Sequence, residues 1–132
     1  MESDANYEKQ NIKKIIEYST IPGTSRHHWG TDIDIIDANP MIQKNVLDPE
    51  KFKDGGPYFK LRNWLEKNAH SYGFYIVYTN DENRKGFKYE PWHYSYKSIS
   101  KSMLQEFLKI DLIKLFENED ILGKEYLDTI FC

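Results

Sequence analysis

The sequence feature that most constrains the fold is the segment Gly30 to Asp37, in which polar and apolar residues alternate with a period of two. Such alternation is typical of a β-strand with one face against an apolar layer. We therefore predict a strand over this segment, with Ile33 and Ile35 facing the apolar layer. Asp32 and Asp34 are then expected on the opposite face, away from that layer.

A second strand-forming region is aromatic and β-branched, and it predicts a hairpin. Its arms are Phe74 to Thr79 and Gly86 to Tyr96, joined by a polar loop. Alternation in the second arm places His93 and Ser95 on one face, and the aromatic residues Trp92, Tyr94 and Tyr96 on the other.

Helices are predicted where apolar residues recur at helical spacing. Ser3 or Asp4 is the expected N-cap of the first helix, which ends before Pro22-Gly23. The second helix covers Tyr58 to Tyr72, and Gly73 is a natural stop after it. Their apolar stripes are Tyr7, Ile12, Ile15 and Ile16 in the first helix, and Leu61, Trp64, Leu65 and Ala69 in the second.

The C-terminal part of the chain predicts a closing helix. Ser102-Met103-Leu104-Gln105 resembles a capping box, and an apolar stripe follows at Leu104, Phe107, Leu108, Leu112 and Leu115. The acidic segment Glu117 to Asp120 is expected to be peripheral, with a short final helix docking through Ile121, Leu122, Tyr126, Leu127 and Ile130. Ala38 to Pro57 is rich in Asn, Pro, Asp and Gly and predicts a long surface loop with one short helical turn.

Length and composition limit the class of protein. A chain of 132 residues has the size of one domain, so we predict a single α+β domain over residues 1–132, with a small antiparallel sheet packed with helices. The formal charge of −3, with scattered lysines, argues against nucleic acid as a partner. No run approaches the roughly 18 apolar residues needed to cross a bilayer. Met1 to Gln10 has no signal-peptide pattern.

The candidate chemistry comes from two histidines and two carboxylates. Cys132 is the sole cysteine, so a metal site here must use His and carboxylate ligands. His27 and Asp34 lie on a loop and the strand that leaves it, and His93 lies on the hairpin arm. Three such ligands suit one catalytic zinc ion that keeps a fourth position for water.

Glu90 is the candidate general base beside that metal. Pro91 cannot donate to a strand ladder, so we expect a bulge or a strand start there that turns Glu90 toward the metal. A carboxylate that does not bind the zinc can take a proton from the bound water and pass it to the leaving amine.

Other readings of the same residues remain open. His28 is expected to be exposed or to support the ligands, and Asp32 to orient His27 or to cap the loop. The default role of Trp29, Trp92, Tyr94 and Tyr96 is core packing. The aromatic share of 15% also suggests a cleft lined with amphipathic rings.

Taken together, the two motifs resemble those of a known family. Ser25-x-His27-x-x-Gly30-x-x-x-Asp34, followed 56 positions later (90 − 34) by Glu90-x-Trp92-His93, is similar to the signature of VanY-type zinc D-alanyl-D-alanine carboxypeptidases. This group includes VanX-type dipeptidases and phage L-alanyl-D-glutamate endolysins. The resemblance runs from about Ile16 to Tyr96.

The resemblance implies a fold shared with the hedgehog signalling domain, one zinc ion and peptidoglycan stem peptides as partners. It matches His27, Asp34 and His93 to the zinc ligands and Glu90 to the catalytic base. It also places Ser25 near the substrate and Trp92 beside the metal histidine. The implied activity is hydrolysis of the terminal D-Ala-D-Ala bond by a monomer in the periplasm or cell envelope.

One departure from the family pattern concerns the group that polarises the scissile carbonyl. Family members have an Arg upstream of the first motif, where this chain has Ala5 or Asn6. Either an N-terminal segment is missing from this chain or the donor has been lost. Arg26 and Arg84 are candidate substitutes, and Arg84 is therefore included among the expected substrate-binding residues. An endopeptidase of the lysin kind and a catalytically silent, zinc-stabilised wall-binding domain are the alternative functions.

Overall fold

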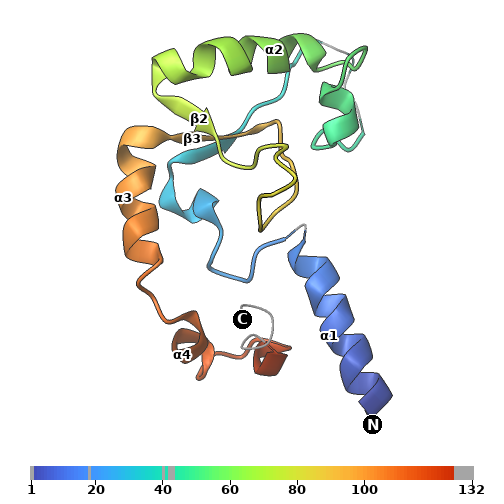
Figure 1. Ribbon diagram of the computed structural model, residues 1–132, viewed down its shortest axis with the longest axis vertical. Coiled ribbons are helices and arrows are strands. Elements are labelled where there is room, and N and C mark those ends of the chain that lie inside the picture. The colour runs from blue at the N-terminus through green and yellow to red at the C-terminus, as the bar shows by residue number, and fades with distance from the viewer. Residues whose placement is uncertain (1, 18, 40, 42–43, 127–132) are drawn as a thin grey trace.

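A three-stranded antiparallel sheet lies in the middle of the molecule, and helices extend from it toward both ends (Figure 1). The computed structural model describes residues 2–17, 19–39, 41 and 44–126. The strand order is β1-β3-β2, with β1 at Asp32–Asp34, β2 at Phe74–Ile76 and β3 at His93–Tyr96. The α+β class is confirmed, and the predicted hairpin forms because β2 pairs with β3.

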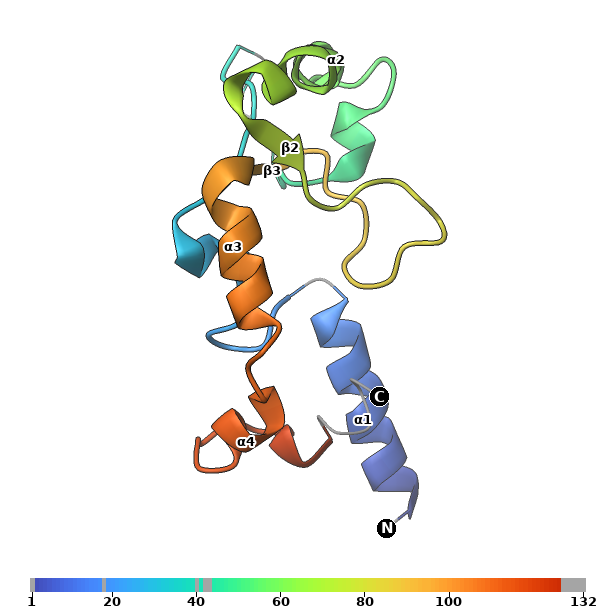
Figure 2. The same cartoon turned by 60° about the vertical axis from the view of Figure 1, so that its left-hand side comes forward.

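The helices lie toward the two ends of the molecule, on either side of the sheet (Figures 1 and 2). In both views α2 lies at one end of the molecule, and α1 and α4 lie at the other, with α3 running between the sheet and α4 (Figures 1 and 2). The α-helices are α1 (Glu2–Ile16), α2 (Phe59–Asn68), α3 (Lys97–Phe107) and α4 (Leu112–Phe116). The 3-10 helices are η1 (Arg26–Trp29), η2 (Pro49–Phe52), η3 (Ala69–Tyr72) and η4 (Lys124–Tyr126).

The second predicted helix is present as α2 followed by η3. It ends at Gly73, whose φ of 83° is in the left-handed region that favours glycine. A Cβ atom at this position would lie 2.8 Å from a ring carbon of Tyr96, so space as well as backbone conformation calls for glycine.

The predicted faces of the first strand are correct, since Ile33 lies opposite the core residue Tyr94 and Asp32 lies opposite Ser95, but the burial of the two faces was not predicted. The side chains do alternate, but Ile33 is 44% exposed whereas Asp32 is only 6% exposed. A carboxylate can be buried in this way only when hydrogen bonds or charges compensate it, and Asp32 has both. Ile35, just beyond β1, does pack on the core.

The two predictions of helix N-caps are wrong. Ser3 and Asp4 lie inside α1, and Ser102 lies in the middle of α3 rather than at its start. The third helix begins earlier because β3 runs directly into it, and the Lys97 N–H donates to the Gly73 carbonyl at 2.8 Å. The local Ser102 signal therefore falls within a helix that tertiary structure has already started.

The predicted closing helix is two helices in the structure. The chain leaves the helical path after Phe107, and Asp111 caps α4 by accepting a hydrogen bond from the Lys114 N–H at 3.1 Å. As a result the predicted stripe is not continuous, and Leu108 is exposed. In the tail Ile121 packs on the core, whereas Leu122 is exposed. The predicted docking of Leu127 and Ile130 lies outside the described residues.

Among the residues that the structure describes, the apolar core forms three clusters. Two of them, beside the sheet, share Leu61: one is built on Leu65, Ala69 and Tyr94, the other on Phe52, Tyr58 and Trp92. The third joins the C-terminal end of α1 to α4 through Ile16, Ile21, Leu112, Phe116 and Ile121. Part of each predicted helical stripe is solvent-exposed, including Tyr7, Ile15 and Trp64.

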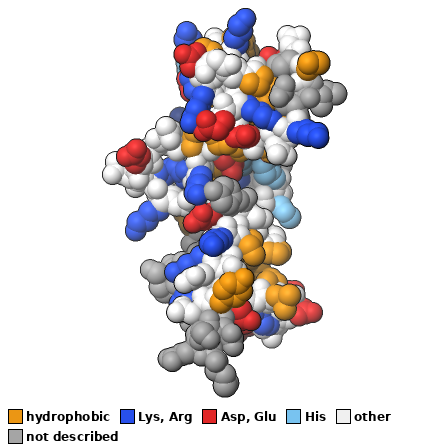
Figure 3. All heavy atoms as spheres, turned by 90° about the vertical axis from the view of Figure 1, so that its right-hand side faces the viewer, with side chains coloured by type: hydrophobic (Ala, Val, Ile, Leu, Met, Phe, Trp, Pro, Cys, Tyr) orange, Lys and Arg blue, Asp and Glu red, His pale blue; other side chains and the backbone are white. Residues whose placement is uncertain are grey.

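Charges of both signs are interspersed on the face shown in Figure 3, which has no large patch of one sign. None of the helices in the described ranges is long and apolar enough to cross a membrane; the longest, α1, has 15 residues.

The long loop before α2 contains the predicted helical turn, η2, and is anchored by Phe52. The Phe52 side chain is fully buried, and its ring lies 5.0 Å from the Tyr58 ring and 5.6 Å from the Trp92 ring between centroids. Phe52 therefore connects this loop to the segment that precedes β3.

Phe52→Ala is expected to lower the free energy of unfolding by about 3–5 kcal/mol, because it leaves a cavity between two aromatic rings. Urea denaturation followed by tryptophan fluorescence measures the change. Leu122→Ala is the control: Leu122 is 98% exposed, so its truncation should change stability by no more than about 0.5 kcal/mol. Equal, small effects for the two variants would show that the loop is not anchored by Phe52.

Candidate metal centre

The first motif forms a single 3-10 turn with a cap at each end. The Ser25 hydroxyl caps η1 by accepting a hydrogen bond from the His27 N–H at 3.3 Å. Gly30, with a φ of 69°, ends the turn, and its N–H donates to the His27 carbonyl at 3.2 Å. The serine and the glycine thus shape the backbone on either side of His27, and β1 follows immediately.

The register of β1 against β3 brings the two motifs together. Asp34 pairs with His93 and Asp32 pairs with Ser95 across the antiparallel ladder. Residues directly opposite each other have Cβ atoms about 5 Å apart and project to the same face. The polar positions of the two strands therefore form one polar layer.

The second motif is a tight turn that ends where β3 begins. The His93 N–H donates to the Glu90 carbonyl at 3.2 Å, and Pro91 is buried within the turn. The turn brings the Glu90 carboxylate back toward the imidazole, so that Glu90 Oε2 lies 3.2 Å from His93 Nδ1. The strand start predicted at this proline is confirmed.

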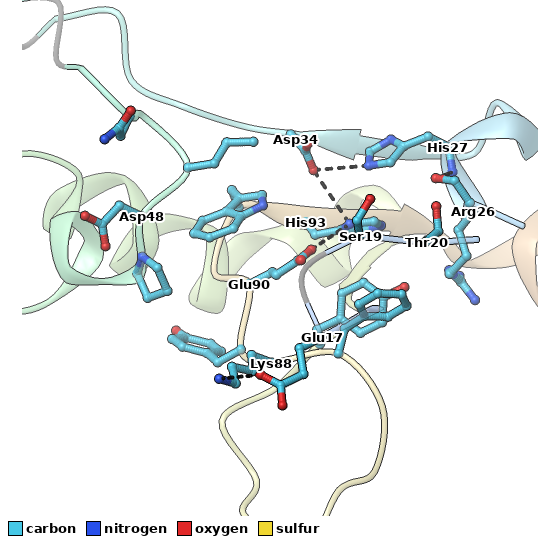
Figure 4. Close-up of a pocket in the computed structure, with 18 residues that line it drawn as sticks. Glu17, Ser19, Thr20, Arg26, His27, Asp34, Asp48, Lys88, Glu90 and His93 are labelled. Carbon is cyan, nitrogen blue, oxygen red and sulfur yellow. Dashed lines mark hydrogen bonds and ion pairs between the residues drawn. The ribbon is translucent and has the colours of Figure 1, made fainter. Parts of the chain in front are cut away.

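Asp34 lies between the two histidines (Figure 4). Its Oδ1 atom is 3.5 Å from His27 Nε2 and 3.6 Å from His93 Nδ1. One ligand atom from each of the three residues lies within 4.8 Å of the others. Two ligands of a tetrahedral zinc, each about 2.1 Å from the ion, would be about 3.4 Å apart, so the observed spacing suits that ion.

Asp32 orients both histidines. Its backbone carbonyl lies 3.1 Å from His27 Nδ1, and its Oδ2 atom lies 2.7 Å from His93 Nε2. Both oxygens are acceptors, so each of these ring nitrogens carries the proton. The remaining nitrogens, His27 Nε2 and His93 Nδ1, are the ones that face Asp34. Metal-binding histidines typically have this kind of support on the nitrogen that does not bind the ion.

The Asp32 carboxylate is itself fully buried and belongs to a network that also includes Arg26. Arg26 Nε donates to Oδ2 at 2.8 Å, and the hydroxyls of Thr31 and Ser95 donate to Oδ1 at 2.9 and 2.5 Å. Arg26 Nη2 continues the network to the Tyr75 and Ser95 hydroxyls. Burial alone would raise the pKa of Asp32, but these hydrogen bonds outweigh burial and lower it, so the group is a carboxylate at neutral pH.

His93 lies between two carboxylates. Burial lowers its pKa, but the hydrogen bonds to Glu90 and Asp32 raise it, and the net pKa is above the ordinary value for histidine. The two carboxylates thus favour a proton on Nδ1 as well as on Nε2. A metal ion at Nδ1 would take the place of the proton there.

These residues form one end of a cavity of about 800 Å³. At the other end the Lys88 ammonium lies 3.1 Å from the Glu17 carboxylate, which joins the segment after α1 to the loop between β2 and β3 (Figure 4). Both side chains are about half exposed, so the ion pair contributes little to stability.

The sequence-predicted substrate residues differ in their relation to the cavity. Ser25 and Trp92 line it, and Trp92 also packs in the core. Arg84 is not among its lining residues; its guanidinium donates to the carbonyls of Thr79, Lys85 and Phe87. His28 is exposed and lies outside the candidate cluster. Substrate binding by Ser25, Trp92 and Arg84 stays a prediction.

Sequence reasoning missed three features of the site: the depth of Asp32, its ion pair with Arg26, and Tyr78. The burial of Asp32 had a signal in the sequence, because alternation places Asp32 and Asp34 on one face of their strand, and His93 and Ser95 on one face of theirs. Two polar faces on adjacent strands indicate a shared polar layer. Tyr78 lines the cavity with its ring against His93, and burial raises its pKa to about 12.

The chain is similar to known proteins. The sequence model of the VanY family, described as D-alanyl-D-alanine carboxypeptidase, matches residues 3–99. A Haemophilus influenzae protein described as uncharacterized is 35% identical over 117 residues, or 84% of this chain and 89% of that protein. A D-alanyl-D-alanine carboxypeptidase of Enterococcus faecium is 29% identical over 91 residues, or 68% of this chain and 25% of that protein. No solved structure matches the chain.

Asp32→Asn is expected to weaken zinc binding by about 10- to 100-fold, because the amide no longer accepts from His93 as a carboxylate does. It should also lower the free energy of unfolding by roughly 3–5 kcal/mol, since Arg26 loses its buried counter-ion. Competition with a fluorescent zinc chelator measures the first effect and urea denaturation the second. Asp54→Asn, at an exposed loop position, is the matched control. Unchanged zinc affinity in Asp32→Asn would contradict the orienting role.

Proposed function

Because the chain belongs to the VanY family of D-alanyl-D-alanine carboxypeptidases, we propose that it is a zinc-dependent peptidase that removes the terminal D-alanine from peptidoglycan stem peptides. The observation that carries this proposal is the convergence of His27, Asp34 and His93, whose ligand atoms lie within 4.8 Å of one another, with Glu90 beside them. Family membership supports the carboxypeptidase class, and the residues support the metal.

His27, Asp34 and His93 would hold the metal, through the two ring nitrogens that face Asp34 and through its carboxylate. A zinc ion held there would supply a Lewis acid that favours attack of water on the scissile carbonyl. The buried Asp32 accepts from His27 Nδ1 and His93 Nε2, so that the other nitrogen of each ring is available to the metal. This preorganisation comes from the chain itself, since its hydrogen bonds are already made.

Glu90 would move the proton. Its Oε2 atom is 3.2 Å from His93 Nδ1, at the edge of the ligand cluster, and its side chain is 22% exposed. A carboxylate in this position can take a proton from the attacking water and then deliver it to the amine of the departing D-alanine. Ser25 and Trp92, which line the same cavity, would contact the stem peptide around the reacting bond.

The substrate also implies where the protein acts. Peptidoglycan stem peptides are exposed outside the cytoplasmic membrane, so the proposed activity places the protein in the periplasm or cell envelope. The proposed active form is a monomer, because all four site residues come from one chain.

Glu90→Gln is expected to lower kcat for a stem pentapeptide by about 100- to 10,000-fold, because it removes the acid-base group while preserving shape. Release of D-alanine, followed by mass spectrometry with zinc-loaded protein, measures turnover. Elemental analysis should still find one zinc per chain. The control is Glu82→Gln, an exposed position in the loop between β2 and β3, which should retain full activity.

The same assay separates the alternatives. His93→Ala should lose both zinc and turnover, whereas full activity in Glu90→Gln would show that Glu90 is not the base. Cleavage inside the stem peptide, read from product masses, would indicate an endopeptidase of the lysin kind. Binding of muropeptides by the zinc-loaded wild type without any cleavage would indicate a catalytically silent wall-binding domain.

A further inference from the structure

We infer that the Tyr78 hydroxyl donates a hydrogen bond to the oxygen of the scissile carbonyl as that oxygen gains negative charge. The inference rests on the proposed function and names a catalytic residue for it. Peptide hydrolysis passes through a tetrahedral state with charge on this oxygen, and a positioned donor there typically contributes about 100- to 1000-fold in rate. The chain has no arginine at the upstream position where the family resemblance predicts the donor.

Arg26 lines the cavity but is committed elsewhere. Its Nε atom is 2.8 Å from Asp32, and its Nη2 atom is 3.0 Å from the Tyr75 hydroxyl and 3.1 Å from the Ser95 hydroxyl. Turning the guanidinium toward substrate would leave the buried Asp32 carboxylate without its counter-ion, which is strongly unfavourable. Arg26 therefore holds the site together and is a poor candidate for the donor.

Arg84 is held against Tyr78 rather than in the cavity. Its guanidinium carbon lies 5.5 Å from the Tyr78 ring centroid, and its N–H groups donate to carbonyls of its own loop. This arrangement makes Arg84 a support for the ring. The residue next to the proposed metal ligands is therefore Tyr78, whose ring contacts His93, and not Arg84.

Tyr78 is fixed on several sides and lines the cavity. Its ring meets the His93 ring edge-on at 4.9 Å and the Phe87 ring at 5.2 Å between centroids. Its backbone carbonyl accepts from the Glu90 N–H at 3.1 Å, so the tyrosine and the proposed base are tied to each other. A ring held in this way loses little freedom when its hydroxyl binds substrate.

The hydroxyl is chemically suited to the task. A phenol with an ordinary pKa of about 10 carries its proton at neutral pH and can donate it to an oxyanion. No hydrogen bond joins this hydroxyl to another residue in the part of the chain that the structure describes. Its donor can therefore serve a ligand without breaking an existing contact.

In the reaction that this donor assists, Glu90 carries the proton from water to the departing amine. Water adds to the carbonyl carbon while its proton passes to Glu90, and the carbonyl electron pair moves onto the oxygen that faces Tyr78. When that pair returns, the C–N bond breaks, and the amine of D-alanine takes the proton from Glu90. Tyr78 keeps its own proton throughout.

Tyr78→Phe tests the inference, because phenylalanine preserves the ring packing against His93 and Phe87. We expect kcat for the stem pentapeptide to fall by about 100- to 1000-fold with little change in KM. A phosphinate analogue of D-Ala-D-Ala presents an anionic oxygen at the tetrahedral centre, and its affinity, measured by calorimetry, should fall by a similar factor. Zinc content should stay at one per chain.

Tyr89→Phe is the matched control, since Tyr89 lines the same cavity but its hydroxyl interacts with Arg62. It should keep the wild-type kcat and phosphinate affinity. An active wild type whose Tyr78→Phe variant retains both would overturn the role of Tyr78 and leave the proposed function standing. A zinc-loaded wild type that neither cleaves the peptide nor binds the phosphinate would overturn the proposed function, and this inference with it.

Discussion

Burying the Asp32 carboxylate in the three-residue strand β1 would be prohibitive without compensation, and the candidate site is built around that compensation. Its partners come from η1, from Thr31 and from β3: Arg26, Ser95 and His93 all reach the same two oxygens. Because these partners are far apart in sequence, the network acts as a cross-link between segments. The same cross-link sets the orientation of both histidines, so stability and ligand geometry have a common origin.

The apolar core supports this polar network from the other face of the sheet. Tyr94, between His93 and Ser95, is buried against α2. Trp92, just before β3, packs on Phe52 from the preceding loop. The two sides of β3 thus differ, with apolar packing on one side and the polar network on the other.

The sequence predicted which side chains would converge at the candidate site better than it predicted their surroundings. His27, Asp34 and His93, with Glu90 beside them, were candidates because metal ligands are restricted in residue type, and the structure brings these four side chains together. The burial of Asp32 was not predicted, because alternation shows which residues share a face of a strand but not whether that face is covered. The predicted burial of Trp64 and the predicted helix start at Ser102 were wrong for a related reason. A helical stripe or a capping box is a local pattern, whereas exposure and helix starts depend on which elements pack nearby.

The pairing of Asp34 with His93 across β1 and β3 has a consequence for how the sequence can change. A shift of one residue in either strand would turn one ligand to the opposite face and separate the pair. Insertions within the strands, or between Glu90 and His93, are therefore excluded for any descendant that keeps the ligand set. Length changes at the exposed tip of the loop between β2 and β3, around Asp81 to Asn83, leave both the register and these positions intact.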